Sequence, residues 1–113
     1  MGFNIAVSPS FWAEVKLSVT GEDGRLVEGT VKGKFKRLKR DEITAFLAKN
    51  KSAVPSADNL LEVSEDWKGV ADDAGEMTFT PENFARACQQ IPGFALAWSQ
   101  AFIKGSWGAR EGN

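Results

Sequence analysis

The stretch FWAEVKLSVTGEDGRLVEGTVKGKFKR, residues 11–37, carries the pattern that decides the fold. In its first part, residues 11–20, every odd-numbered side chain is apolar, and the even-numbered side chains after Trp12 are polar. In its second part, residues 25–37, Val27, Val31 and Phe35 again share the odd parity, with mostly polar residues between them. Successive side chains of a β-strand point to opposite faces, so this alternation predicts two half-buried strands.

The segment between these strands, GEDG at residues 21–24, predicts a hairpin with a fixed register. Pairing Val19 with Val27 keeps both apolar faces together and leaves a three-residue loop in which Gly24 can adopt a positive φ. In that register Glu14 faces Lys32, and Trp12 lies near Lys34. The segment FNIAV, residues 3–7, is a candidate for a further strand at the sheet edge, ending at Pro9.

After residue 38 the apolar spacing changes from two residues to three or four, which predicts four helices. The first has acids in its opening turn, the second is capped by Ser56 and ends at Gly69, and Thr80 caps the third. The fourth runs from about Phe94 to Ile103. Their inward residues are expected to include Phe46, Leu60, Val63, Trp67, Phe84, Cys88, Ile91 and Trp98.

The sequence therefore predicts one α+β domain over residues 1–113: an N-terminal antiparallel β-hairpin, three-stranded if residues 3–7 join it, packed against about four α-helices. Residues 1–38 form the β-rich part, 39–105 the helical part and 106–113 a flexible tail. We expect the apolar strand face to pack on the helices; it consists of Ala13, Val15, Leu17, Val27, Val31 and Phe35.

The composition argues against an enzyme and against a bound cofactor or metal. The chain has no histidine, and Cys88 is its single cysteine. No phosphate loop, nucleophile elbow or zinc spacing occurs. The acidic stretch at residues 66–84 fails as a calcium loop, because placing Gly75 sixth puts Val70 first and Pro81 twelfth, and neither supplies a side-chain oxygen. No apolar run approaches the roughly 20 residues that cross a bilayer, so no membrane role is expected.

Charge is divided along the chain. Residues 32–40 hold six of the 14 basic residues, whereas residues 41–82 hold ten acids and three lysines. These two regions either neutralise each other within one molecule or attract between molecules. The second interpretation makes Lys32, Lys34 and Lys36 candidates for self-association, and an array built head to tail would form rings or filaments. A phosphate-binding role is a third interpretation, which the negative net charge disfavours.

Four tryptophans and eight phenylalanines are many for 113 residues. Most must be core residues, but large rings also occur on the polar strand parity and near the C-terminus. Such rings are typical of protein interfaces. The candidates for partner binding are Trp12, Trp98, Phe102 and Trp107.

Several short motifs occur in a characteristic order: SPSFWAEVKLSV at 8–19, FKRLKRDEI at 35–43, DWKGV at 66–70, FTPENF at 79–84, IPG at 91–93 and AREGN at 109–113. Together they resemble the small tail assembly chaperones of long-tailed bacteriophages and prophages. Lys39 stands where the family pattern favours a serine or threonine cap, and Gly112 where it favours a lysine.

This resemblance implies a binding protein without catalytic residues. Such chaperones coat the long helical tape measure protein in the host cytoplasm until the tail tube polymerises, and they are absent from the mature virion. The implied partners are the tape measure protein and other tail proteins, while association with further copies of the chain is an expectation from the divided charge. Two alternatives stay open: a virion structural component such as a tail-completion protein, and a small nucleic-acid-binding module that uses residues 32–40.

Overall fold

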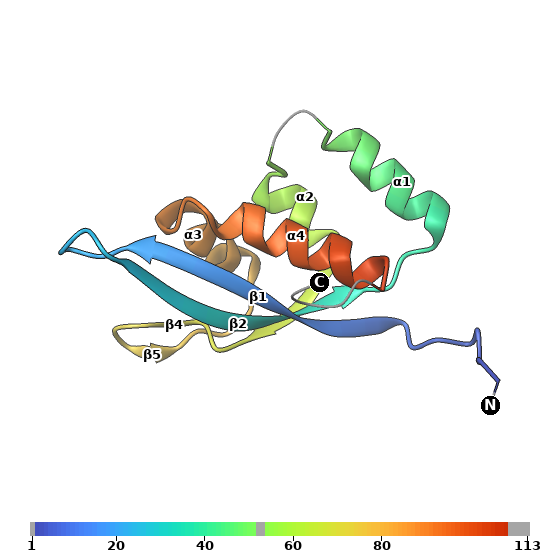
Figure 1. The fold of residues 1–113 in the computed structure, drawn as a ribbon, viewed down its shortest axis with the longest axis horizontal. Coiled ribbons are helices and arrows are strands. Elements are labelled where there is room, and N and C mark those ends of the chain that lie inside the picture. The colour runs from blue at the N-terminus through green and yellow to red at the C-terminus, as the bar shows by residue number, and fades with distance from the viewer. Residues whose placement is uncertain (1, 52–53, 109–113) are drawn as a thin grey trace.

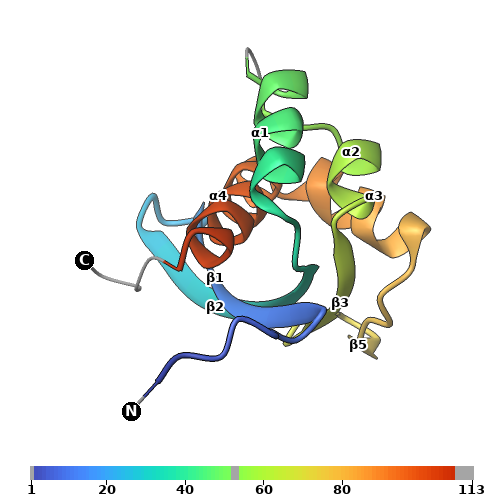
Figure 2. The same ribbon diagram turned by 90° about the vertical axis from the view of Figure 1, so that its right-hand side faces the viewer.

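The computed structural model describes residues 2–51 and 54–108. Within them, three strands form an antiparallel sheet in the order β1–β2–β3, and the four helices gather on one face of it (Figures 1 and 2). The predicted α+β class is confirmed. In chain order the elements are β1 (Ser10–Thr20), β2 (Leu26–Lys36), α1 (Arg40–Lys49), α2 (Ala57–Leu61), β3 (Ser64–Lys68), β4 (Ala71–Asp72), β5 (Gly75–Glu76), α3 (Pro81–Gln90) and α4 (Phe94–Ser106).

The β1–β2 hairpin has the register that its alternation predicts. Val19 pairs with Val27, and Trp12 pairs with Lys34. Gly24 has a φ of 84°, a left-handed conformation that glycine adopts without a steric penalty. Local sequence chemistry therefore determines this hairpin almost completely.

The core lies between the inner face of the sheet and the helices. Its fully buried side chains are Val15, Phe35, Leu60, Phe84, Phe94, Trp98 and Phe102. The predicted inward strand residues Val15, Val31 and Phe35 are buried, but the prediction for Val27 is wrong, since 61% of it is exposed. The reason is visible in Figure 1, where the tip of the β1–β2 hairpin projects beyond the helices.

The third strand does not come from the N-terminal segment. Phe3 and Ile5 are each 88% exposed, and residues 2–9 form no strand. Instead the predicted second helix is short, and residues 64–68 form β3, which pairs with β2 from Lys32 to Phe35. Pairing with β2 satisfies the backbone of this segment, and it buries the inward ring of Trp67 beneath α3 and α4.

The chain after β3 also differs from the prediction. Gly69 does not end a helix: it has a φ of 88° and turns the chain from β3 into a small hairpin of β4 and β5. Met77 follows this hairpin and is buried, and its carbonyl accepts a 2.7 Å hydrogen bond from Trp67 Nε1. The hairpin therefore joins the sheet to α3.

The helix starts follow the predicted capping chemistry. The hydroxyls of Ser56 and Thr80 each accept a hydrogen bond from a backbone N–H of the following turn, as predicted. Lys39, which cannot accept such a bond, precedes α1, and there the Glu42 carboxylate accepts from the Lys39 N–H at 2.8 Å. Helix α4 extends to Ser106, three residues past the expected end. The remaining tail, residues 109–113 with Gly112, lies outside the described residues.

Candidate functional site

Trp12 lies on the face of the sheet that the helices leave uncovered, and 39% of it is exposed. The Lys68 ammonium group lies 4.3 Å from the centre of the Trp12 ring, and that of Lys34 lies 6.0 Å from it. Cations at these distances are attracted to the face of an indole. The pairing of β1 with β2 and of β2 with β3 brings these three side chains together from three strands.

The three lysines predicted for self-association share this outer face. Lys32, Lys34 and Lys36 occupy alternate positions of β2, so their side chains project on the same side. Lys34 also lies 4.0 Å from the Glu65 carboxylate, and Lys32 pairs with Glu14 on one side and Lys68 on the other. The lysine row is therefore partly neutralised within one molecule, and its role between molecules stays a prediction.

Trp107, which is 50% exposed, follows α4, the helix that packs on the inner face of the sheet, so it does not share the outer face with Trp12. Helix α4 ends against Phe11, the neighbour of Trp12, because Gly105 leaves room for the Phe11 ring. The Arg37 guanidinium group lies 5.1 Å from the centre of the same ring. We call the outer-face cluster of Trp12, Lys34 and Lys68 the tryptophan end.

The other two candidates, Trp98 and Phe102, are not surface residues. Both are 0% exposed, so neither side chain can contact a partner in this conformation. Trp98 stacks on Phe94 with ring centres 5.6 Å apart, and its Nε1 donates a 2.8 Å hydrogen bond to Ser64 Oγ. Their spacing on α4 is the stripe of a core helix, which corrects the prediction that they bind a partner.

An apolar groove that sequence reasoning missed lies beside the projecting part of the hairpin. Its cavity is about 220 Å³, and its lining includes Leu17, Val31, Val70, Met77, Ala87 and Ile91. At its rim Arg86 donates a 2.9 Å hydrogen bond to Asp72, which joins α3 to β4 and lowers the pKa of the Asp72 carboxyl. The sequence signal for this groove is the apolar parity of Leu17 and Val31 in the two strands that help to line it.

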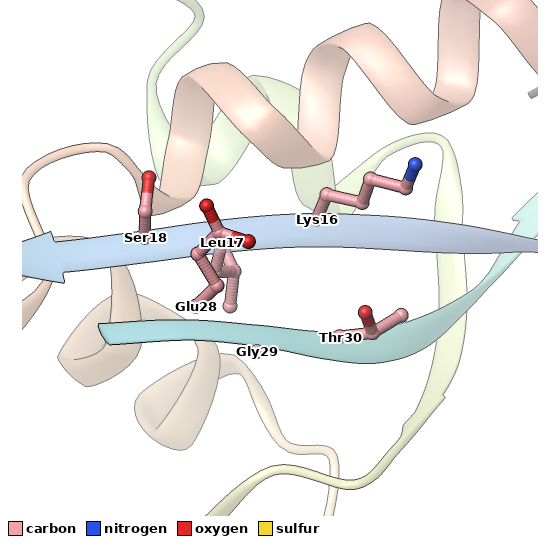
Figure 3. A pocket seen from close by; sticks show the side chains of 6 residues that line it. All are labelled: Lys16, Leu17, Ser18, Glu28, Gly29 and Thr30. Atoms are coloured by element: carbon pink, nitrogen blue, oxygen red, sulfur yellow. The ribbon is translucent and has the colours of Figure 1, made fainter. Parts of the chain in front are cut away.

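A second hollow, of about 360 Å³, lies over paired residues of β1 and β2 (Figure 3). Three residues from each strand line it, and Gly29 contributes no side chain. Its charged groups, Lys16 and Glu28, come with no histidine or cysteine. Apart from these charges, the lining carries the hydroxyls of Ser18 and Thr30 and the apolar side chain of Leu17.

A family model described as phage tail assembly chaperone matches residues 1–113. The chain belongs to this family. No curated protein and no solved structure matches the chain.

Membership of the tail assembly chaperone family confirms the resemblance seen in the motifs. It also places the chain in a family of chaperones and not of enzymes. Burial raises the pKa of the Cys88 thiol to about 11, which leaves it almost wholly protonated at neutral pH. Across residues 2–51 and 54–108, no three His, Cys, Asp or Glu side chains group to hold a metal ion, and no helix could cross a membrane.

Proposed function

We propose that this tail assembly chaperone binds the tape measure protein and keeps it soluble in the bacterial cytoplasm while the tail tube assembles. The chaperone then leaves before the virion is complete. Family membership supports a role in tail assembly. The observation that supports a direct contact is the exposed indole of Trp12, held between Lys34 and Lys68 on a sheet face free of helices.

The tryptophan end suits an amphipathic helix with acidic residues on its flank. Tryptophan is among the residues that dominate binding energy at protein interfaces. The apolar stripe of a helix would cover the Trp12 ring, and its carboxylates would pair with Lys34 and Lys68. A long, helical protein repeats such stripes along its length, so many copies of the chaperone could bind one partner.

Co-expression with the tape measure protein tests this proposal. The fraction of tape measure protein that stays soluble is measured with the wild-type chaperone and with Trp12→Ala or Trp107→Ala. We expect each substitution to weaken binding about tenfold or more, the effect of losing an interface hot spot of roughly 1.4–2 kcal/mol. Leu96→Ala is the matched control, because Leu96 is 45% exposed at the far end of α4. Equal solubility with all four proteins would contradict the proposal.

The same proteins distinguish the two alternative functions. A nucleic-acid-binding module would bind DNA with an affinity that falls steeply as salt rises, and it would depend on the basic residues 32–40. A structural component would persist in purified virions. We expect neither result from a chaperone of the tape measure protein.

A further inference from the structure

The segment before β1 is an uncovered apolar arm. We define the arm as residues 2–7, in which Phe3, Ile5 and Val7 alternate with smaller or polar residues. These three side chains are 88%, 88% and 53% exposed. The arm has no charge, and its hydrogen bonds are local, for example from the Val7 N–H to the Ile5 carbonyl at 3.0 Å. A β-strand that docks on a sheet edge requires alternating apolar side chains and a backbone that is not already paired with another strand.

The projecting half of β2 has a backbone edge that faces away from β1. In an antiparallel pair, the residues that bond the partner strand alternate with residues whose N–H and C=O groups point outward. The Gly21 N–H donates to the Arg25 carbonyl at 2.7 Å, so odd-numbered residues of β2 bond β1. The Lys36 N–H donates to Val63 at 2.9 Å, so even-numbered residues point to the other side.

By this alternation the even-numbered residues direct their backbone groups toward the side where β3 lies. Gly69 lies against the carbonyl of Thr30, which leaves Leu26 and Glu28 uncovered. Strand β3 reaches along β2 only as far as Lys32. In the part of the chain that the structure describes, no strand continues β3 along residues 26–29. We call these residues the free edge of β2.

The apolar groove lies next to this free edge, beginning at Val31 of the same strand. Val31 of β2, Val70 beyond the end of β3, and Ile91 after α3 all line it. The inner face of the same hairpin carries Val19 and Val27, which are 41% and 61% exposed. A strand added at the free edge would place every second side chain over this apolar surface.

The arm is too short to pair as a strand with the free edge of the same molecule. Residues 26–30 pair with residues 16–20 of β1, whose midpoint, Ser18, is eight residues from Ser10, or about 26 Å along the strand. The eight residues 2–9 span at most about 29 Å when fully extended. An arm that folded back would need nearly this whole length to reach the free edge, and no residues would remain to pair with it. Figure 1 shows the arm and the hairpin tip at opposite ends of the molecule.

We infer that the arm of one copy docks as an added strand on the free edge of β2 in a second copy, with Phe3, Ile5 and Val7 covering the apolar groove. The contact needs backbone hydrogen bonds and apolar side chains but no charge. It therefore differs from association through the lysine row, which salt would weaken within a screening length of about 10 Å. This inference concerns chain–chain contacts and does not depend on the tape measure partner.

Sedimentation of the full chain and of a variant lacking residues 2–7 tests the inference. Ser8 and Pro9 are kept, because their carbonyls accept hydrogen bonds from Arg37 at 2.8 and 2.9 Å. We expect concentration-dependent oligomers of the full chain that persist in about 0.5 M salt, where charge contacts are screened, and a monomer without the arm. A full chain that stays monomeric, or oligomers that survive the deletion, would overturn the inference.

A proline pair tests which edge receives the arm. Glu28→Pro removes an N–H from the free edge, while Ser18→Pro, its direct cross-strand partner, removes one from the opposite edge of the sheet. Both leave the hydrogen bonds between β1 and β2 intact, so their melting temperatures should shift alike. We expect only Glu28→Pro to abolish oligomers, and an equal effect of both prolines would refute docking at this edge.

Disulfide trapping shows whether the contact is between copies. In a Cys88→Ser background, protein with Ile5→Cys is mixed with protein carrying either Val27→Cys or Leu26→Cys and is then oxidised. Val27 lies on the inner face and Leu26 on the outer face of the same strand. The inference predicts a covalent heterodimer of Ile5→Cys with Val27→Cys, and at most slow trapping with Leu26→Cys. Equal trapping at both positions would contradict it.

Discussion

The buried hydrogen bond between Trp98 and Ser64 offers a quantitative test of the core. Ser64 is 7% exposed; its hydroxyl accepts from Trp98 Nε1 at 2.8 Å and donates to the Leu60 carbonyl at 2.6 Å. In Ser64→Ala the Leu60 carbonyl keeps its 3.1 Å bond from the Val63 N–H. The Trp98 N–H loses its hydrogen-bond acceptor, and because the ring is fully buried, water cannot replace it.

Leaving one buried donor unpaired costs about 1–3 kcal/mol. For a domain near 100 residues, each kcal/mol lowers the melting temperature by about 4–8 °C, so Ser64→Ala should lower it by roughly 4–24 °C. Urea unfolding followed by circular dichroism gives the free energy of unfolding directly.

A double-mutant cycle separates the hydrogen bond from simple packing loss. Trp98→Phe removes the donor itself, so adding Ser64→Ala to it leaves no orphan N–H. We expect Ser64→Ala to cost much less in the Trp98→Phe protein than in the wild type, which gives a coupling energy of about 1 kcal/mol or more. Additive losses, or a Ser64→Ala protein as stable as the wild type, would refute this account of Trp98 as a hydrogen-bonded core residue.

Three further predictions concern packing, chemistry and charge. Gly33→Ala should lower the free energy of unfolding by about 1–3 kcal/mol through overpacking, because the new Cβ would lie 2.7 Å from Trp98 Cη2. Gly29→Ala is the control: it has open space around it and should not destabilise the protein in the same urea titration. Cys88, with its pKa raised by burial to about 11, should react with a thiol reagent far more slowly near pH 8 than the same residue in urea, and equal rates would place it on the surface. Replacing Lys32, Lys34 and Lys36 with glutamate should abolish any self-association that weakens between roughly 0.05 and 0.5 M salt, without lowering the melting temperature. Sedimentation across salt concentrations measures this, and salt-sensitive association that survives the three substitutions would contradict it.

The β1–β2 hairpin could be read from the sequence because its determinants are local. Alternation places the apolar face, and Gly24 places the turn, so the register follows without knowledge of the helices. Strand β3 could not be read in this way. Leu60, Val63 and Trp67 have spacings that fit a helix, and the strand forms only because β2, about 30 residues earlier in the chain, supplies its backbone partner.

The candidate site was only partly predictable for a related reason. Trp12 and Trp98 are the same residue type, and composition alone cannot tell an exposed ring from a buried one. Trp12 stands on the polar parity of a strand, which marks it as outward-facing, and the structure agrees. Trp98 and Phe102 are four residues apart on α4, and that spacing is more typical of a core stripe than of a surface. The apolar groove forms from separate elements, so it cannot be predicted from the pattern of any single segment.

Quantitative mass spectrometry of tail assembly intermediates and of finished virions tests the central claim most directly. We expect the chaperone to co-purify with the tape measure protein in intermediates, Trp12→Ala to reduce its amount there, and finished virions to contain none. A fixed number of copies in finished virions, or intermediates in which the chaperone never accompanies the tape measure protein, would contradict it.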